Sequence, residues 1–223
     1  MSNSVFIHAH NIISPLGVTS EANFDNVLQG KTGIQKQLNI AIDDAELHAS
    51  LIDDNSFLHF INEQNNFTRF ETLAIASIQQ SLKEATIDVS SEKTIFILST
   101  TKGNIALLEN NEVNTELYKR ISLFHSAKLI AQHFNNQNTP VVISNACISG
   151  IAAIIYAKRM LENGVYENAV VVGADTISKF VYSGFKSFHA LSKGICKPFS
   201  FDRDGINLGE AAATVILSTS SQS

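Results

Sequence analysis

Four short runs of apolar residues constrain the fold of this chain more than any other feature of its sequence. Each run has the length of a β-strand and stays apolar without alternating, which is typical of strands covered on both faces. The four runs lie at residues 94–99, 141–144, 169–174 and 211–218. Helical patterns separate them, and strands that alternate with helices predict a layered α/β fold. With a further β-rich run at 5–13, we expect a mixed, mostly parallel five-stranded sheet between helices.

The expected helices are indicated by end signals and by apolar spacing. Residues 68–71 form a capping-box pattern, in which side chains satisfy free amide groups at a helix start. This pattern predicts a helix from Thr68 to about Ala85. Three further helices are expected, over residues 21–29, about 113–134 and 148–163.

The chain of 223 residues has 44% hydrophobic residues, enough to bury a core without disulfide staples. We expect one domain over residues 1–218. Within it, acidic and amide pairs interrupt short apolar pieces between about 35 and 66, which predicts an irregular insertion with a helical turn or two. Residues 219–223 are rich in serine and are predicted to be a tail or a linker stub.

Composition excludes several classes of function. Sixteen basic residues against twenty-one acidic ones give a net charge of −5 without a basic cluster, so no nucleic-acid partner is expected. No stretch approaches about 20 apolar residues, so no membrane partner is expected either. The first residues lack the pattern of a signal peptide, and two cysteines make no disulfide framework. Both observations favour a reducing, cytoplasmic location.

Cys147 stands where a nucleophile would stand. It follows the apolar run 141–144 and opens a hydrophobic helix, and functional groups gather at the carboxyl ends of parallel strands. The free amide groups of a helix N-terminus also stabilise a thiolate. The alternative is a buried cysteine that only fills space. The hydrolase elbow G-x-S-x-G is not met, because Asn145 replaces its first glycine.

The residues around Cys147 carry a family resemblance. The segment SNACISG at 144–150 resembles the active-site strand, turn and helix of β-ketoacyl synthases, condensing enzymes of the thiolase-like superfamily. Further blocks resemble the same family in the same order: SPLG at 14–17, GKTGI at 30–34, VVGAD at 171–175, SGF at 183–185, ALS at 190–192 and FDRDGINLGEA at 201–211. The chain is therefore identified as similar to the N-terminal half of that thiolase-like fold.

The resemblance implies a chemistry for the chain. Cys147 would accept an acyl group from a thioester, for decarboxylative Claisen condensation with a malonyl unit in fatty acid or polyketide-type synthesis. Its own amide would be one of two donors to the developing oxyanion. Phe185 aligns with an aromatic residue that lines the acyl pocket, although a plain core phenylalanine is the alternative. Arg203 and Asp204 would form a buried turn that ties loops beneath the site.

The resemblance also implies the partners. Substrates would arrive on the phosphopantetheine of acyl carrier protein, so no cofactor and no metal are expected. The strand at 141–144 would be the edge at which two protomers pair, giving a homodimer, or a heterodimer with a ketosynthase chain or a C-terminal half. We expect self-association of this chain, because a half-fold exposes an apolar face.

Departures from the family pattern keep alternatives open. In the family, two histidines, a lysine and the second oxyanion donor come from the second half of the fold, which the sequence beyond 210–218 does not supply. We therefore expect the chain to be inactive without a C-terminal half, and each of its seven histidines has a reading other than the catalytic base. In the turn TTKGN at 100–104, Lys102 either narrows an acyl channel or is a solvated loop charge. Two further functions remain: a non-catalytic partner like a chain-length factor, and a cysteine hydrolase.

Overall fold

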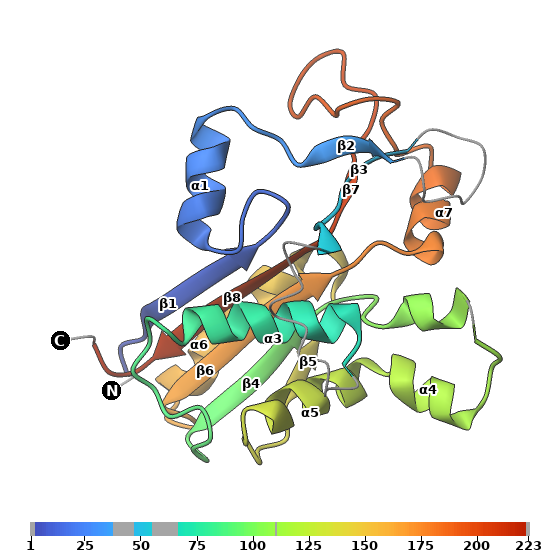
Figure 1. Cartoon of the computed structure of the whole chain (residues 1–223). Helices are drawn as coiled ribbons and strands as arrows, with labels where there is room; N and C mark the ends of the chain where they lie inside the picture. The colour runs from blue at the N-terminus through green and yellow to red at the C-terminus, as the bar shows by residue number, and fades with distance from the viewer. Residues whose placement is uncertain (1–2, 38–46, 55–66, 110, 222–223) are drawn as a thin grey trace.

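A five-stranded mixed sheet forms the centre of the molecule (Figure 1). The structure is a computed structural model that describes residues 3–37, 47–54, 67–109 and 111–221. The strands in spatial order are β1 (Phe6–Ile13), β8 (Ala211–Ser218), β6 (Asn168–Asp175), β4 (Thr94–Ser99) and β5 (Val141–Ile143). β8 runs antiparallel to both of its neighbours, whereas β6, β4 and β5 pair in parallel. Four strands therefore point the same way, as the sequence predicts.

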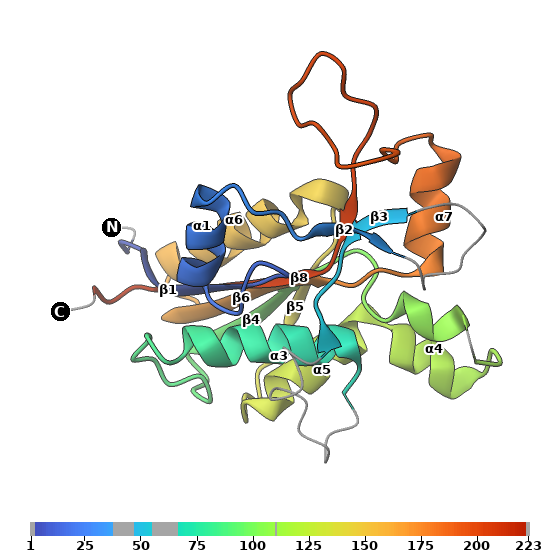
Figure 2. The same ribbon diagram turned by 45° about the horizontal axis from the view of Figure 1, so that its top comes forward.

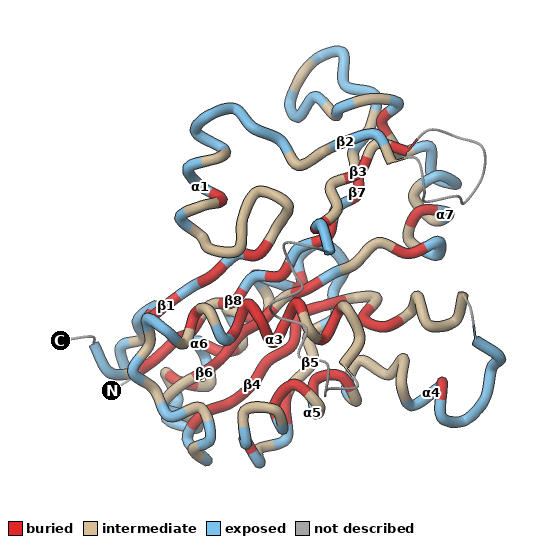
Figure 3. The backbone as a smooth tube through the Cα atoms, in the orientation of Figure 1, coloured by how far each residue is buried: buried red, intermediate tan, exposed pale blue. Residues whose placement is uncertain are grey.

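Helices cover both faces of this sheet, which explains why β4 is apolar throughout. α3 (Arg69–Ser81) and α5 (Leu123–His133) lie on one face, and α6 (Ser149–Glu162) lies on the other (Figure 2). Along β4, Phe96 and Leu98 pack in the cluster with α3 and α5, while Ile95 and Ile97 pack in the cluster with α6. Strand residues alternate between faces, so both sets are buried (Figure 3).

A second, smaller sheet lies above the carboxyl ends of the strands (Figure 1). It consists of β2 (Ile34–Gln37), β3 (Leu47–Ser50) and β7 (Leu208–Gly209). β2 and β3 pair antiparallel, and β3 pairs in parallel with β7. The prediction of an irregular insertion over residues 35–66 is therefore wrong for these two strands. Their sequences are short and partly polar, so they lack the apolar pattern by which a strand is recognised. Residues 38–46 and 55–66 lie outside the described part of the chain.

The remaining helices differ from the predicted ones in their bounds. α1 (Ser20–Leu28) begins after Thr19, whose side chain accepts a hydrogen bond from the amide of Ala22. The helix expected over about 113–134 is two helices, α4 (Thr115–Ile121) and α5. They are separated by Ser122, which has an extended backbone (φ −63°, ψ 125°). α7 (Lys179–Ser187) follows β6.

Two chain segments differ from the prediction: β5 is more exposed than expected, and the C-terminal tail is better anchored. β5 is half-buried, not fully buried, because it is the edge strand and has a neighbour on one side only. The predicted tail is held at its start, where the Thr219 amide donates to the Glu167 carbonyl at 2.9 Å.

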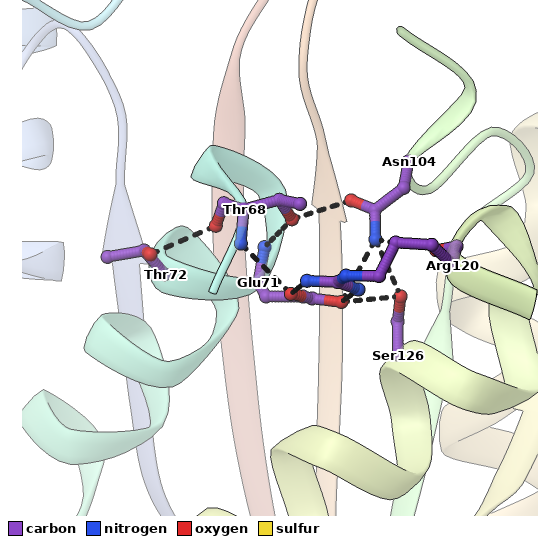
Figure 4. A network of polar contacts seen from close by, with 6 residues as sticks. All are labelled: Thr68, Glu71, Thr72, Asn104, Arg120 and Ser126. Carbon is purple, nitrogen blue, oxygen red and sulfur yellow. Dashed lines mark hydrogen bonds and ion pairs between the residues drawn. The ribbon is translucent and has the colours of Figure 1, made fainter. Parts of the chain in front are cut away.

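A buried ion pair fastens the turn after β4 to the helices. The capping box at the start of α3 is present, as predicted. Its Glu71 carboxylate also accepts from Arg120 and from Ser126 Oγ (2.8 Å), and Asn104 Nδ2 donates to it at 2.9 Å (Figure 4). Desolvation raises the pKa of Glu71, but the hydrogen bonds, foremost from Arg120, outweigh it and leave the pKa below its ordinary value. The network holds Asn104 and thereby positions the turn at residues 100–104.

Candidate active site

The carboxyl ends of β4, β5 and β6 meet at one edge of the sheet, and Cys147 lies at that edge. It belongs to a 3-10 turn, Ala146–Ile148, that joins β5 to α6. The sequence predicts that Cys147 opens the helix, but in the structure the turn comes first and α6 begins at Ser149. The Cys147 side chain is exposed and forms no disulfide. The cysteine is thus presented to solvent at the end of a parallel sheet, where such folds bind ligands.

The turn at Cys147 is sharp and is fixed by one hydroxyl. Ala146 has φ of 45°, in the left-handed region that a residue with a Cβ rarely adopts. Ser149 Oγ accepts from the Asn145 amide at 2.7 Å and donates to the Ala146 carbonyl at 2.8 Å. This hydroxyl closes the turn on both sides. The expected sharp turn among small residues is therefore present.

Two cavities open at Cys147. They have volumes of about 320 Å³ and about 270 Å³ and share five lining residues, Thr101, Ala146, Cys147, Asp175 and Gly209. The larger cavity is bounded mainly by small residues at the ends of β4, β6 and β8. The smaller one reaches α7. A group bound to the Cys147 sulfur can enter either space.

Phe185 and Cys147 both line the smaller cavity. Phe185 lies on α7, is half-buried, and lines the cavity together with Ile177, Val181 and Leu208. Phe185 also packs against the buried cluster of Leu47, Ala49, Tyr182 and Leu208. It is therefore at once a core residue and a wall of the cavity, so its two sequence interpretations do not exclude one another.

Asp175 is a site residue that the sequence analysis does not single out, and it ends β6 at the edge that carries Cys147. Its carboxylate reaches the cavities and accepts a hydrogen bond from Thr100 Oγ1 at 3.0 Å. Desolvation by the surrounding protein raises the pKa of Asp175, against the opposing effects of the Thr100 hydrogen bond and the Lys102 charge. The signal for Asp175 in the sequence is its position at the end of a buried run, the run that follows the Cys147 helix along the chain.

Histidines are absent from the described walls of both cavities. The structure places His8 and His10 on β1, His48 on β3, His125 and His133 on α5, and His189 after α7. His59 lies outside the described residues. Within the described ranges there is also no group of three or more His, Cys, Asp or Glu side chains that could hold a metal ion.

The loop that contains Arg203 and Asp204 differs from the prediction of a buried turn. Both residues are exposed. Asp204 does tie loops together, because it accepts from Ser192 Oγ at 2.6 Å and from the Lys193 amide at 3.2 Å. Among the described residues, Arg203 donates to the Ser200 carbonyl of its own loop, at 3.0 Å, and to no other loop. The described residues leave Arg203 and Asp204 exposed to solvent, so the predicted burial of this turn is wrong.

Comparison with protein families decides the identity of the fold. The family model described as "Beta-ketoacyl synthase, N-terminal domain" matches residues 2–223. The chain belongs to the β-ketoacyl synthase family. The resemblance and the thiolase-like fold class predicted from the sequence are both confirmed.

Individual relatives of this β-ketoacyl synthase domain are distant. It is 26% identical to 3-oxoacyl-[acyl-carrier-protein] synthase 2 of Synechocystis sp., covering 92% of this chain and 55% of the relative. It is 25% identical to the protein of the same name from Staphylococcus aureus strain COL, covering 96% and 57%. The chain therefore spans little more than half the length of the curated relatives that it matches.

Solved structures show the same fold. The ishigamide ketosynthase/chain length factor matches with a TM-score of 0.87 at 22% identity, over 98% of this chain and 59% of that one. A ketosynthase (ApeO) in complex with its chain length factor (ApeC), from Xenorhabdus doucetiae, matches with a TM-score of 0.82 at 22% identity, over 99% and 59%. In the described part of the β-ketoacyl synthase domain, no helix has the length and apolar character needed to span a bilayer.

Proposed function

We propose that this chain is the acyl-accepting portion of a β-ketoacyl-ACP synthase and that Cys147 is its nucleophile. The observation that best supports this function is the position of Cys147: its side chain is exposed on a tight turn at the carboxyl edge of the sheet, and it lines two cavities. The Cys147 thiolate attacks the thioester carbonyl, a C–S bond to Cys147 forms as the carrier C–S bond breaks, and the carrier thiolate that leaves takes up the proton that Cys147 released. The Cys147 amide is one of two donors that stabilise the developing oxyanion, and the second donor comes from the C-terminal half.

The apolar part of the smaller cavity supports an acyl substrate. Ile177, Val181, Phe185 and Leu208 offer an aliphatic and aromatic surface beside the cysteine. Cavities of this size hold small ligands and are usually lined by such side chains with a few polar groups. In this proposal Phe185 contacts the acyl chain. The substrate is carried on the phosphopantetheine of acyl carrier protein, so the reaction uses no separate cofactor.

A protein partner is proposed to complete the site. The decarboxylative step needs bases that we assign to a C-terminal half or to a paired ketosynthase chain. Several observations support such a partner: β5 is an edge strand, and three exposed isoleucines, Ile148 in the turn before α6 and Ile151 and Ile155 on α6, form an apolar stripe. Phe199 and Phe201 are also fully exposed. Contiguous exposed apolar surface marks interaction sites, so we propose a homodimer or heterodimer.

Two free cysteines agree with a cytoplasmic location.

Acyl transfer to Cys147 is the test of this proposal. The chain, alone and with a C-terminal ketosynthase half added, is incubated with acyl-loaded acyl carrier protein and then analysed by intact-protein and peptide mass spectrometry. We expect one acyl adduct on Cys147, absent from C147A and retained in the matched control C196A. No adduct in either preparation, or an adduct on Cys196 alone, would contradict the proposal.

A chain-length-factor-like subunit is the second candidate. The solved structures that share this fold include two ketosynthase and chain length factor pairs, which favours it. The retained Cys147 weighs against it, because such partners typically replace the cysteine. Co-expression with a ketosynthase distinguishes the two: a chain-length factor keeps its effect on product length in C147A, whereas a nucleophile loses all turnover. A cysteine hydrolase would need a histidine near Cys147, and the described cavity walls contain none.

A further inference from the structure

The smaller cavity at Cys147 has two kinds of wall. Its apolar wall consists of Ile177, Val181, Phe185 and Leu208. The other side chains that line it are mainly polar: Thr101, Lys102, Asp175 and Thr176. An unsubstituted alkyl chain matches the first wall only, and it would remove water from the second without replacing the lost hydrogen bonds. Leaving buried polar groups unpaired is costly, so the cavity is suited to a ligand that is itself partly polar.

Lys102 is the charged donor in this polar wall. It is half-buried in the turn after β4. Its ammonium donates to Thr101 Oγ1 at 3.1 Å, which is the hydrogen bond that its side chain makes among the described residues. An ammonium group has three donors. Lys102 can therefore give a further charge-assisted hydrogen bond to a ligand in the cavity.

Asp175 does not neutralise Lys102 by direct contact. It is near enough for the Lys102 charge to act on its carboxylate, but the described contacts of the two side chains include no ion pair. Asp175 accepts instead from Thr100. The turn that carries Lys102 is held in place by Asn104, which bonds to Glu71 and Ser126. The turn that carries Lys102 is thus held in place, Lys102 lines the same cavity as Cys147, and its ammonium keeps donor capacity.

We propose that Lys102 is a specificity-determining residue that favours, on Cys147, an acyl group with an oxygen substituent over an alkyl chain of the same length. The substituent, an oxo or a hydroxyl group, accepts a hydrogen bond from the Lys102 ammonium. The hydrocarbon part packs on Val181 and Phe185. This inference rests on the proposed function, because it identifies the class of acyl group that the nucleophile carries.

The test uses two alkylating probes that differ in one oxygen, N-hexyl chloroacetamide and N-(5-oxohexyl) chloroacetamide. The Cys147 sulfur displaces chloride from either probe, a C–S bond forms, and the thiol proton passes to the buffer. Peptide mass spectrometry measures the two rates at Cys147, with Cys196 as the internal reference thiol. We expect the oxo probe to be preferred at Cys147 by about tenfold, the scale of one hydrogen bond from a charged donor, and no preference at Cys196.

Two charge-removing variants identify the residue responsible. K102M is expected to abolish the preference at Cys147. Lys128 lies on α5 and lines a separate cavity. K128M is therefore expected to keep the preference at Cys147. Equal rates in the wild type, or a preference that persists in K102M, would overturn the inference. Alkylation needs no acyl carrier protein, so a preserved preference without acyl transfer would refute the proposed function and leave the cavity preference standing.

Discussion

Glu71 lets the cost of breaking an internal ion pair be predicted from the structure. Its side chain is fully buried and accepts hydrogen bonds from Arg120, Asn104 and Ser126. The substitution Glu71→Gln keeps the shape and removes the charge that compensates Arg120. Removing one partner of a buried pair costs about 3–5 kcal/mol. Because the Arg120 side chain is 23% exposed, we expect the lower end, about 3 kcal/mol.

Urea unfolding at pH 7, followed by circular dichroism, measures this cost. E116Q is the matched control, because Glu116 forms an exposed ion pair with Lys119 on α4. We expect its unfolding midpoint to equal that of the wild type. The double variant E71Q/R120M should recover part of the lost stability, since it leaves no uncompensated charge behind. An E71Q variant as stable as E116Q would refute the account of the network.

The same carboxylate predicts a pH dependence. Its pKa lies below the ordinary value of 4.5 in the folded protein, so the folded state binds this proton less readily than the unfolded state. The stabilising contribution is therefore complete above pH 4.5 and is lost as pH falls through the folded pKa. The stability difference between wild type and E71Q should shrink in acid. A difference that grows below pH 4.5 would show that the sign is wrong.

Two other perturbations have defined outcomes. Gly205 has φ of 155°, and an added Cβ would lie 2.5 Å from backbone atoms of the preceding loop. G205A should therefore lose at least about 2 kcal/mol in urea unfolding, whereas G194A, with open space around its Cβ, should be neutral. The exposed Ile151 and Ile155 on α6 should drive self-association in size-exclusion chromatography with light scattering. I151K/I155K should then elute as a smaller species, while V113K, at another exposed apolar residue, should not. A monomeric wild type would contradict this.

The central sheet could be predicted because its signal is local. Apolar runs over 94–99 and 211–218 coincide with β4 and β8 to the residue. The capping box at Thr68 likewise starts α3 where expected. These features depend on side chains within a few residues of one another, so a single segment carries the information.

The features that were missed depend on contacts far apart in the chain. β3 is a strand because it pairs with β2 and β7, and β7 lies about 160 positions further along. The break between α4 and α5 at Ser122 is missed for a different reason: it is a local change of backbone conformation, and no glycine or proline at that position indicates it in the sequence. For the site, Cys147 was identifiable from its position after a buried strand. Asp175 acquires its surroundings only when β4 and β6 lie side by side, with Thr100 beside it.

The place of β8 in the sheet has a consequence for synthesis on the ribosome. β8 fills the gap between β1 and β6, and it is the strand that pairs with β1. During synthesis, residues 6–13 therefore lack their pairing strand until residues 211–218 leave the exit tunnel. Pairings this distant in sequence slow folding, and an unpaired strand edge invites aggregation in the interval. Ribosome-stalled chains ending before residue 211 should remain protease-sensitive at β1, and chains long enough to release β8 should become resistant there.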